Sequence, residues 1–296
     1  MSKLSNTLKA LINASHASPG YTPSSAGVQT ALTKFASDAA EKKVGLPAWV
    51  TVSTAVSVTL NCPEAMTQIF HLANSSPSGP RGPRTAAQNA ELIREVGLKC
   101  ISFNGIPRSI NTLGVFYNSL PADVASALDT RARRSLTPEN LEERQRDGLA
   151  LWDSVYRGFE RKLLDKLAQS HPDLPVHILH GHYATLLANP RGGGAYDDAP
   201  AKVGRVLTSL VAVACLRAQT GVAPQVVSHV FGLRKAYQND NDNAGADAEG
   251  EEPVEGGAWL ATDDGNIWLL ESVDKLVSVI TGGQGTTFAP GLRPKL

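Results

Sequence analysis

The sequence of 296 residues predicts an all-α fold. The clearest signal lies in residues 149–167, where apolar side chains recur every three or four positions and charged residues fall mostly opposite them. Three further segments have helical spacing: residues 91–101, 205–219 and 267–280. Upstream of residue 149, Thr137-Pro138-Glu139 combines a hydroxyl cap, a first-turn proline and an acid that faces the helix dipole. We therefore expect a helix to begin there.

Residues 49–60 carry a competing signal. They are rich in Val and Thr, whose branched Cβ atoms restrict the side chain and favour β-strands. Nearly all neighbouring segments have helical spacing, however. We therefore expect a helix here as well.

Three segments are expected to be loops. Residues 74–83 are dense in Ser, Pro and Gly, residues 189–200 contain Gly192-Gly193-Gly194, and residues 238–257 hold seven acids and no Lys or Arg. The acidic segment is predicted to be a solvated, flexible insert. The glycine triplet is not expected to bind phosphate, because no Gly-Lys-Ser/Thr follows it.

The charge pattern argues against a nucleic-acid partner. The formal net charge is zero, and Lys and Arg are scattered without a stripe of basic and aromatic residues. No stretch reaches the roughly 18 apolar residues of a membrane span, and the most apolar run, residues 206–216, predicts a buried helix. The three cysteines cannot form a disulfide framework, which suits a reducing compartment.

A short pattern occurs twice in the chain. A Glu is followed by a Lys four residues later and by a Ser seven residues later, at Glu95, Lys99 and Ser102 and again at Glu271, Lys275 and Ser278. A His in an apolar setting precedes each copy, His71 by 24 residues and His229 by 42. The difference is close to the length of the acidic insert, so we expect a duplicated unit at residues 30–130 and 150–285. The alternative is a chance similarity between two amphipathic helices.

Two passages resemble the alkylhydroperoxidase D-like superfamily, which includes the carboxymuconolactone decarboxylases. Residues 205–233, with His229-Val230-Phe231-Gly232-Leu233, are similar to the family's helix, short connection and His-bearing helix. Residues 91–111 are similar to its following helix, which ends in a Gly-x-Pro turn like Gly105-Ile106-Pro107. The resemblance implies two all-α domains in tandem that form an internal pseudo-dimer, and assembly into a homo-oligomer. We expect residues 1–29 to be an N-terminal extension and residues 286–296 a C-terminal tail, which look like those of fungal members of the family.

The redox motif of that family is missing. A Glu and then Cys-x-x-Cys-x-x-x-His give the family a reactive thiolate and a resolving thiol. The two cysteine positions fall on residues that form no disulfide, Glu64 and Thr67 before His71, and Val222 and Gln225 before His229. We therefore do not expect a two-cysteine peroxidase cycle.

The remaining catalytic candidates are Cys62, Glu64, His71 and His229. Glu64 and His71 lie seven residues apart on one expected helix face, and a carboxylate beside an imidazole is suited to general acid–base catalysis. Cys62 lies two residues before the first missing cysteine position. We expect each imidazole to face an interior cavity; the alternative is that each is a hydrogen-bonded core residue.

Other residue clusters have simpler interpretations. His177, His180 and His182, with Asp173 nearby, are more typical of a helix end or a substrate-channel lining than of a zinc site, and we expect neither metal nor cofactor. Cys100 and Cys215 are expected to be buried and inert. Arg94 and Arg108 flank the Gly-x-Pro turn and are candidates for binding an anionic substrate, although surface ion pairs are the commoner fate of arginines.

The last three residues, Pro294-Lys295-Leu296, resemble a peroxisomal Ser-Lys-Leu import signal and suggest an import-receptor partner. The alternative is an arbitrary frayed end. The first 37 residues lack acids, as in a mitochondrial presequence, but no Arg precedes Arg81. We expect a peroxisomal location, with the mitochondrion or cytoplasm as alternatives.

The leading functional hypothesis is proton transfer by His and Glu, or single-cysteine redox chemistry, on a small organic substrate. It follows from the internal repeat and from the placement of Glu64 and His71. The alternative is a catalytically inactive family member that serves as a binding or assembly module, which the loss of both cysteine pairs favours.

Overall fold

The computed structural model describes residues 4–75, 84–189, 201–238 and 254–285. Within these ranges the regular structure is helical throughout and contains no strand, which confirms the all-α prediction. None of the helices in the described ranges combines the length and apolarity needed to span a bilayer. Of the loops predicted at 74–83 and 189–200, residues 76–83 and 190–200 lie outside the described residues, as do residues 239–253 of the acidic insert and the tail 286–296. Residues 74 and 75 belong to a helix, so that loop begins later than predicted.

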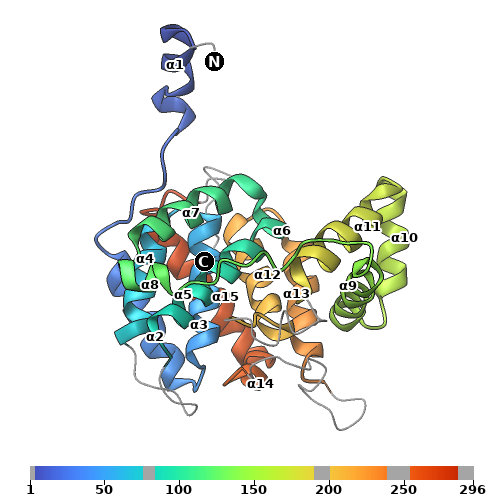
Figure 1. The fold of residues 1–296 in the computed structure, drawn as a ribbon. Helices are drawn as coiled ribbons and strands as arrows, with labels where there is room; N and C mark the ends of the chain where they lie inside the picture. Colours follow the sequence, from blue (N-terminus) through green and yellow to red (C-terminus); the bar gives the residue numbers. More distant parts are fainter. Residues whose placement is uncertain (1–3, 76–83, 190–200, 239–253, 286–296) are drawn as a thin grey trace.

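The N-terminal part of the chain consists of short and medium helices joined by tight turns. Their bounds are α1 Asn6–Ile12, η1 Ser15–Ala17, α2 Val28–Glu41, α3 Leu46–Thr59, α4 Pro63–Ser75, α5 Ala86–Lys99, α6 Ile101–Asn104, α7 Ile106–Ser119 and α8 Ala122–Ser126. Helix α1 has no buried residue and extends away from the body of the molecule (Figure 1). An extended segment after α8 then crosses the front of the molecule to α9.

The C-terminal part begins with three helices that project to one side and ends with helices that return to the centre (Figure 1). Their bounds are α9 Leu141–Tyr156, α10 Glu160–Ser170, α11 Asp173–His177, η2 Ile178–Leu187, α12 Arg205–Gln219, α13 Ala223–Lys235, α14 Gly257–Leu260 and α15 Asp263–Ile280. Element η2 is a π-helix that continues α11. Such helices are rare and often occur at functional sites.

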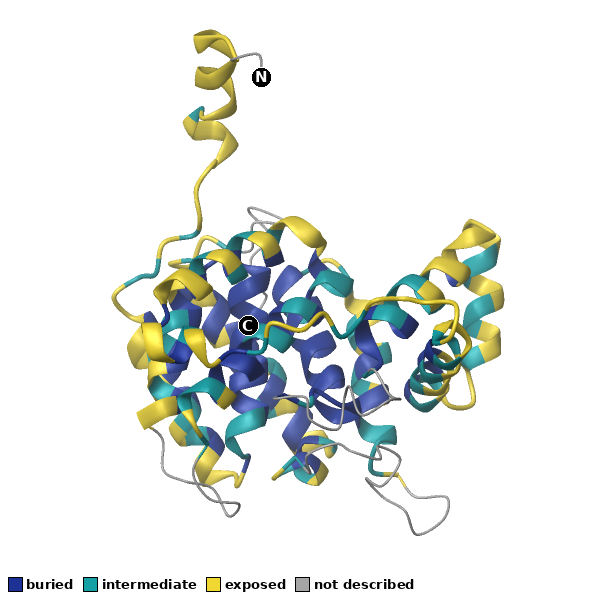
Figure 2. Ribbon diagram, in the orientation of Figure 1, coloured by how far each residue is buried: buried dark blue, intermediate teal, exposed yellow. Residues whose placement is uncertain are grey.

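Helices α3 and α12 pack against each other at the centre of the molecule. Residues 48–59 of α3 are all buried, as are all residues of α12 except Arg217 (Figure 2). A helix that is buried on every side has no need of a polar face, which explains why Val and Thr are tolerated in α3. The hydroxyls of Ser53, Ser57 and Thr59 donate to backbone carbonyls four residues earlier. The helix predicted for residues 49–60 is thus confirmed.

The buried apolar residues form two cores. The larger core extends from Val28 to Ile280 and includes residues of both predicted units, so these units share one interior. The smaller core consists of Trp152, Val155, Tyr183 and Leu187 and joins α9 to η2. The smaller core therefore holds the projecting helices together, and the π-helix is part of it.

The prediction of one continuous helix over residues 149–167 is wrong, because two helices, α9 and α10, cover this range. The chain breaks between α9 and α10 at Gly158, whose φ of 82° lies in the left-handed region that a helix cannot use. The start predicted at Thr137 is also too early, because Thr137 lies in a turn in which its N–H donates to Asn140 Oδ1. Helix α9 begins only at Leu141.

Candidate functional site

Cys62 lies immediately before α4 and is fully buried. Burial raises the pKa of its thiol, and the neighbouring Glu64 carboxylate raises it further, while a hydrogen bond from the Ala65 backbone acts in the opposite direction. The reactive form of cysteine is the thiolate, which this environment disfavours. Cys62 is thus poorly suited to single-cysteine redox chemistry in the folded chain.

Glu64 and His71 both lie on the exposed face of α4. The Oε2 atom of Glu64 accepts a hydrogen bond of 2.8 Å from the backbone N–H of Ser24, so this carboxylate anchors the segment before α2. The ring of His71 lies edge-on to Phe70, with 5.5 Å between ring centroids. The structure does not bring these two side chains into an enclosed cavity, contrary to the sequence-based expectation for His71.

His71 and His229 occupy different positions in their helices. His71 is the ninth residue of α4, whereas His229 is the seventh residue of α13. An offset of two residues corresponds to about 200° around a helix, which places the two side chains on opposite faces. The exposure of the neighbours agrees, because Ile69, seventh in α4, is buried and Phe231, ninth in α13, is exposed.

His229 is buried where α13 packs against α9. Its Nε2 atom lies 3.4 Å from the hydroxyl oxygen of Tyr156, a long hydrogen bond. The hydroxyl of Tyr183 donates to the Tyr156 hydroxyl oxygen over 3.3 Å. The ring of Phe103 from α6 lies perpendicular to the imidazole, at a centroid distance of 5.7 Å. Two hydroxyls and one imidazole therefore form a continuous chain from η2 through α9 to α13.

Trp152 completes this group, which we call the His229 cluster: Trp152, Tyr156, Tyr183 and His229. The Trp152 ring packs 4.2 Å from Tyr156 and 5.1 Å from Tyr183, measured between centroids. Its Nε1 atom is buried and has no hydrogen-bond partner among the residues that the structure describes. Buried donors are nearly always paired in proteins, so this unpaired donor beside two hydroxyls is an unusual feature of the cluster.

A close approach between two helices places Tyr183 in the cluster. Gly148 of α9 lies directly against the backbone of Ala184 in η2, and a Cβ atom at residue 148 would overlap Ala184. Glycine at this position lets the π-helix approach α9 closely enough for Tyr183 to reach Tyr156. The geometry of the cluster thus depends on a residue that is not part of it.

The electrostatic environment keeps His229 neutral. Burial lowers its pKa to about 4, and the positive charge of Arg205 contributes in the same direction. Arg205 is itself held in place by donating to the backbone oxygens of Gly232, at 2.6 Å, and Ser154, at 3.1 Å. Burial also raises the pKa of Tyr156 and Tyr183, so both phenols stay protonated near neutral pH. A neutral imidazole next to protonated hydroxyls is able to accept a proton.

The apolar setting of His229 predicts a role for this residue but not for its partners. Tyr156 falls within the apolar spacing of residues 149–167, and the sequence gives no pattern that marks Tyr183 or Arg205 as site residues. The available signal was the i, i+4 spacing of Trp152 and Tyr156, which places two amphipathic aromatic rings together on one helix face. Nothing in the sequence indicated that η2 would bring Tyr183 to them.

The histidines near η2 do not form a metal centre. His182 Nδ1 lies 2.8 Å from the Ser102 hydroxyl, and the rings of His177 and His182 meet edge-on at 5.2 Å. Burial, followed by the charge of His177, lowers the pKa of His182. In the described part of the chain, no group of three or more His, Cys, Asp or Glu side chains is placed to hold a metal ion.

The remaining candidates have mostly structural roles. Arg94 forms an ion pair with Glu91 at 3.0 Å, and Arg108 donates to the Thr59 carbonyl at 2.6 Å. Cys100 and Cys215 are fully buried, as predicted, with their sulfur atoms 3.6 Å apart across α5 and α12. Burial raises the pKa of Cys100 well above its usual value.

Comparisons with known proteins give one distant similarity. No family model matches the chain, and no solved structure matches it. A protein of Saccharomyces cerevisiae called Peroxisomal protein 2 is similar over 186 residues. That region covers 56% of this chain, and it spans only 59% of the length of the yeast protein. Within it, the chain is 28% identical to Peroxisomal protein 2.

Proposed function

We propose that this chain is a peroxisomal protein of the alkylhydroperoxidase D-like type that acts on a small organic substrate by proton transfer through Tyr156 and His229. The observation that carries the proposal is the hydrogen-bonded chain from Tyr183 through Tyr156 to a buried imidazole with a lowered pKa. The proposal moves the chemistry away from Glu64, His71 and Cys62, because two of these face solvent and the third is a buried, protonated thiol.

The geometry supports a two-proton relay. His229 is buried whereas Tyr156 is partly exposed, so we place the substrate on the Tyr156 side of the relay. The Tyr156 oxygen takes the acidic proton of the substrate while its own proton moves to His229 Nε2. Tyr183 donates a hydrogen bond to the same oxygen and stabilises the negative charge that develops there. The imidazolium lies near Arg205 and has a low pKa, so it readily returns the proton to the product.

The family assignment rests on the resemblance of residues 91–111 and 205–233, and the order of helices is compatible with it. In each half a central helix, α3 or α12, is followed after a short turn by a second helix and later by a third that packs on the central one. The peroxisomal location rests on the similarity to Peroxisomal protein 2. A fluorescent reporter fused ahead of residue 1 tests it, because deletion of Lys295 and Leu296 should disperse a punctate signal. A signal that stays diffuse in the full chain would contradict the location.

Activity assays on variants test the chemistry. Purified protein is offered an organic hydroperoxide with a thiol reductant, and separately a set of lactone and oxo carboxylates whose decarboxylation releases carbon dioxide. Turnover by the wild type should fall about a hundredfold or more in His229→Gln and in Tyr156→Phe, in the range expected for loss of an acid–base group. His71→Gln and Cys62→Ser should retain wild-type rates. Loss of activity in the His71 variant with retention in the His229 variant would refute the proposal.

A second candidate function is assembly, which a different observation favours. Exposed apolar side chains lie one turn apart on two helices, Ile106 and Ile110 on α7 and Val227 and Phe231 on α13. Residues at i, i+4 spacing are neighbours on a helix surface, and contiguous exposed apolar patches mark surfaces that bind another protein. Sedimentation of the wild type and of an Ile110→Glu, Phe231→Glu variant tests this candidate. If the assembly function is correct, the wild type is oligomeric and the variant is a folded monomer.

A further inference from the structure

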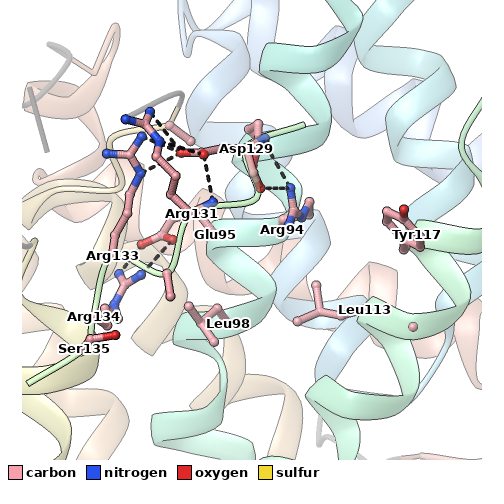
Figure 3. Close-up of a pocket in the computed structure, with 14 residues that line it drawn as sticks. Arg94, Glu95, Leu98, Leu113, Tyr117, Asp129, Arg131, Arg133, Arg134 and Ser135 are labelled. Carbon is pink, nitrogen blue, oxygen red and sulfur yellow. Dashed lines mark hydrogen bonds and ion pairs between the residues drawn. The ribbon is translucent and has the colours of Figure 1, made fainter. Parts of the chain in front are cut away.

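A pocket of about 790 Å³ lies between α5, α7 and the extended segment of residues 129–135 (Figure 3). This size is suited to a small organic ligand. One side of the pocket is formed by charged residues of the extended segment and α5, and the other by Leu98, Leu113 and Tyr117 of the two helices. The pocket therefore has a charged end and an apolar wall.

The charged end carries more positive than negative charge. Four arginines and three acids line it: Arg94, Arg131, Arg133, Arg134, Glu91, Glu95 and Asp129. Hydrogen bonds from Arg131 and Arg133 hold the pKa of Asp129 well below its usual range, and Arg134 with Lys99 lowers that of Glu95 against the effect of burial. Both acids therefore stay ionised. Burial raises the pKa of Glu91, while the hydrogen bond from the Asp129 backbone and the charge of Arg94 act in the opposite direction. With Glu91 counted as a carboxylate, four arginines and three acids leave a single positive charge in excess.

Arg94 has hydrogen-bonding capacity that the protein does not use. Its Nη1 atom donates to Glu91 Oε1 at 3.0 Å and to the Asp129 carbonyl at 3.4 Å. Its Nε and Nη2 atoms have no hydrogen-bond partner among the described residues. These two donors form the edge of the guanidinium that binds a carboxylate through two parallel hydrogen bonds. By contrast, Arg134 uses Nε on the Leu186 carbonyl and both Nη atoms on Glu95.

We propose that this pocket binds an organic monocarboxylate, with the carboxylate on the Nε–Nη2 edge of Arg94 and the apolar body along Leu98 and Leu113. The single excess charge matches one carboxylate. A phosphate dianion would meet the negative charges of Glu91, Glu95 and Asp129 with too little positive charge to offset them. The apolar wall favours an organic ligand, because the ligand's apolar body buries surface against it, whereas an inorganic anion has no apolar surface to bury.

Calorimetric titration of the full chain with octanoate tests the proposal. The wild type should bind octanoate saturably, whereas octanol and inorganic phosphate should not bind measurably over the same concentrations. Arg94→Gln should weaken octanoate binding by at least about tenfold, because it removes the charged edge. Gly114→Leu should weaken it similarly by filling the pocket, since no atom lies within 4 Å of a Cβ at that position. Lys34→Gln, at an exposed site on α2, is the matched control and should bind octanoate like the wild type.

Three results would overturn the proposal: no octanoate binding to the wild type, equal binding of octanol or phosphate, or unchanged binding in both pocket variants. Circular dichroism spectra that match the wild type show that each variant is folded. The site does not depend on the proposed chemistry, so His229→Gln should bind octanoate normally. Failure of this site and failure of the His229 relay are therefore separate outcomes.

Discussion

The Nε2 atom of His229 and the hydroxyl oxygen of Tyr156 are 3.4 Å apart, at the place where the projecting helices meet the central ones. The imidazole comes from α13, which packs on the central helix α12, and the phenol comes from α9, which belongs to the smaller core. The chemistry we propose therefore depends on how the two cores are held together.

Replacing His229 by Gln should reduce the pH dependence of stability. The pKa of His229 falls from the usual 6.5 to about 4 on folding, so the unfolded chain binds more protons between these values. The contribution to stability is complete above pH 6.5 and is lost as the pH falls toward 4. The wild type should therefore lose on the order of 3 kcal/mol more than the variant across this interval. Urea unfolding at pH 7 and pH 4.5 measures the difference, and parallel curves for the two proteins would contradict it.

Replacing Gly148 by Ala should destabilise the chain by roughly 2 kcal/mol, because the added methyl group overlaps the backbone of Ala184. The π-helix must then move away from α9 and take Tyr183 with it. Gly114→Ala is the matched control, since a Cβ there has open space and alanine favours a helix by about 1 kcal/mol over glycine. Thermal unfolding should thus give opposite shifts for the two variants, and equal shifts would argue against the close approach of α9 and η2.

Replacing Lys99 by Met should cost roughly 3 kcal/mol of stability. Lys99 is fully buried, and its ammonium donates to the carbonyls of Leu187 and Val203 and to the side chains of Asn189 and Thr208. Methionine fills a similar volume but leaves these buried acceptors without their donor. Lys275→Met is the control at the matching position of the sequence repeat.

Lys275 is exposed and forms only a surface ion pair with Glu271, so its replacement should change the free energy of unfolding by less than about 0.5 kcal/mol. Equal losses in the free energy of unfolding for the two lysine variants would show that the buried hydrogen bonds of Lys99 do not stabilise the fold.

All three cysteines should resist alkylation in the folded chain. Cys62, Cys100 and Cys215 are buried, and burial raises the pKa of Cys62 and Cys100, so little thiolate is available. Mass spectrometry after treatment with iodoacetamide should find modification only once denaturant is added. Rapid modification of Cys62 under native conditions would contradict this prediction and make Cys62 a candidate for redox chemistry again.

The helical segments could be predicted because the apolar side chains of each helix are spaced so that they fall on the face that packs against the core. Residues 205–219 have this spacing and form α12, and residues 267–280 lie within α15. The break at Gly158 was missed because the apolar periodicity continues across it, on into α10. Sequence spacing reports which face of a helix is buried, but one residue with positive φ redirects the chain without disturbing that spacing.

The site could be predicted only in part. His229 was identified from its apolar setting, but the same argument selected His71, which faces solvent because its register in α4 differs by two residues. Tyr183 bonds the Tyr156 hydroxyl and Arg205 bonds the Gly232 carbonyl from distant parts of the sequence, so their roles depend on tertiary packing that no local pattern encodes. The matched Lys99 and Lys275 likewise lie in opposite environments, one buried and one exposed.

The most direct test of the central claim is an NMR titration of the ¹⁵N-labelled imidazoles from pH 4 to pH 8, in the wild type and in Tyr156→Phe. We predict that His229 stays neutral down to about pH 5, with its proton on Nδ1, and that its Nε2 resonance shifts when the Tyr156 hydroxyl is removed. A His229 resonance that titrates near the usual pKa of 6.5, or that is unaffected by loss of the hydroxyl, would contradict the account.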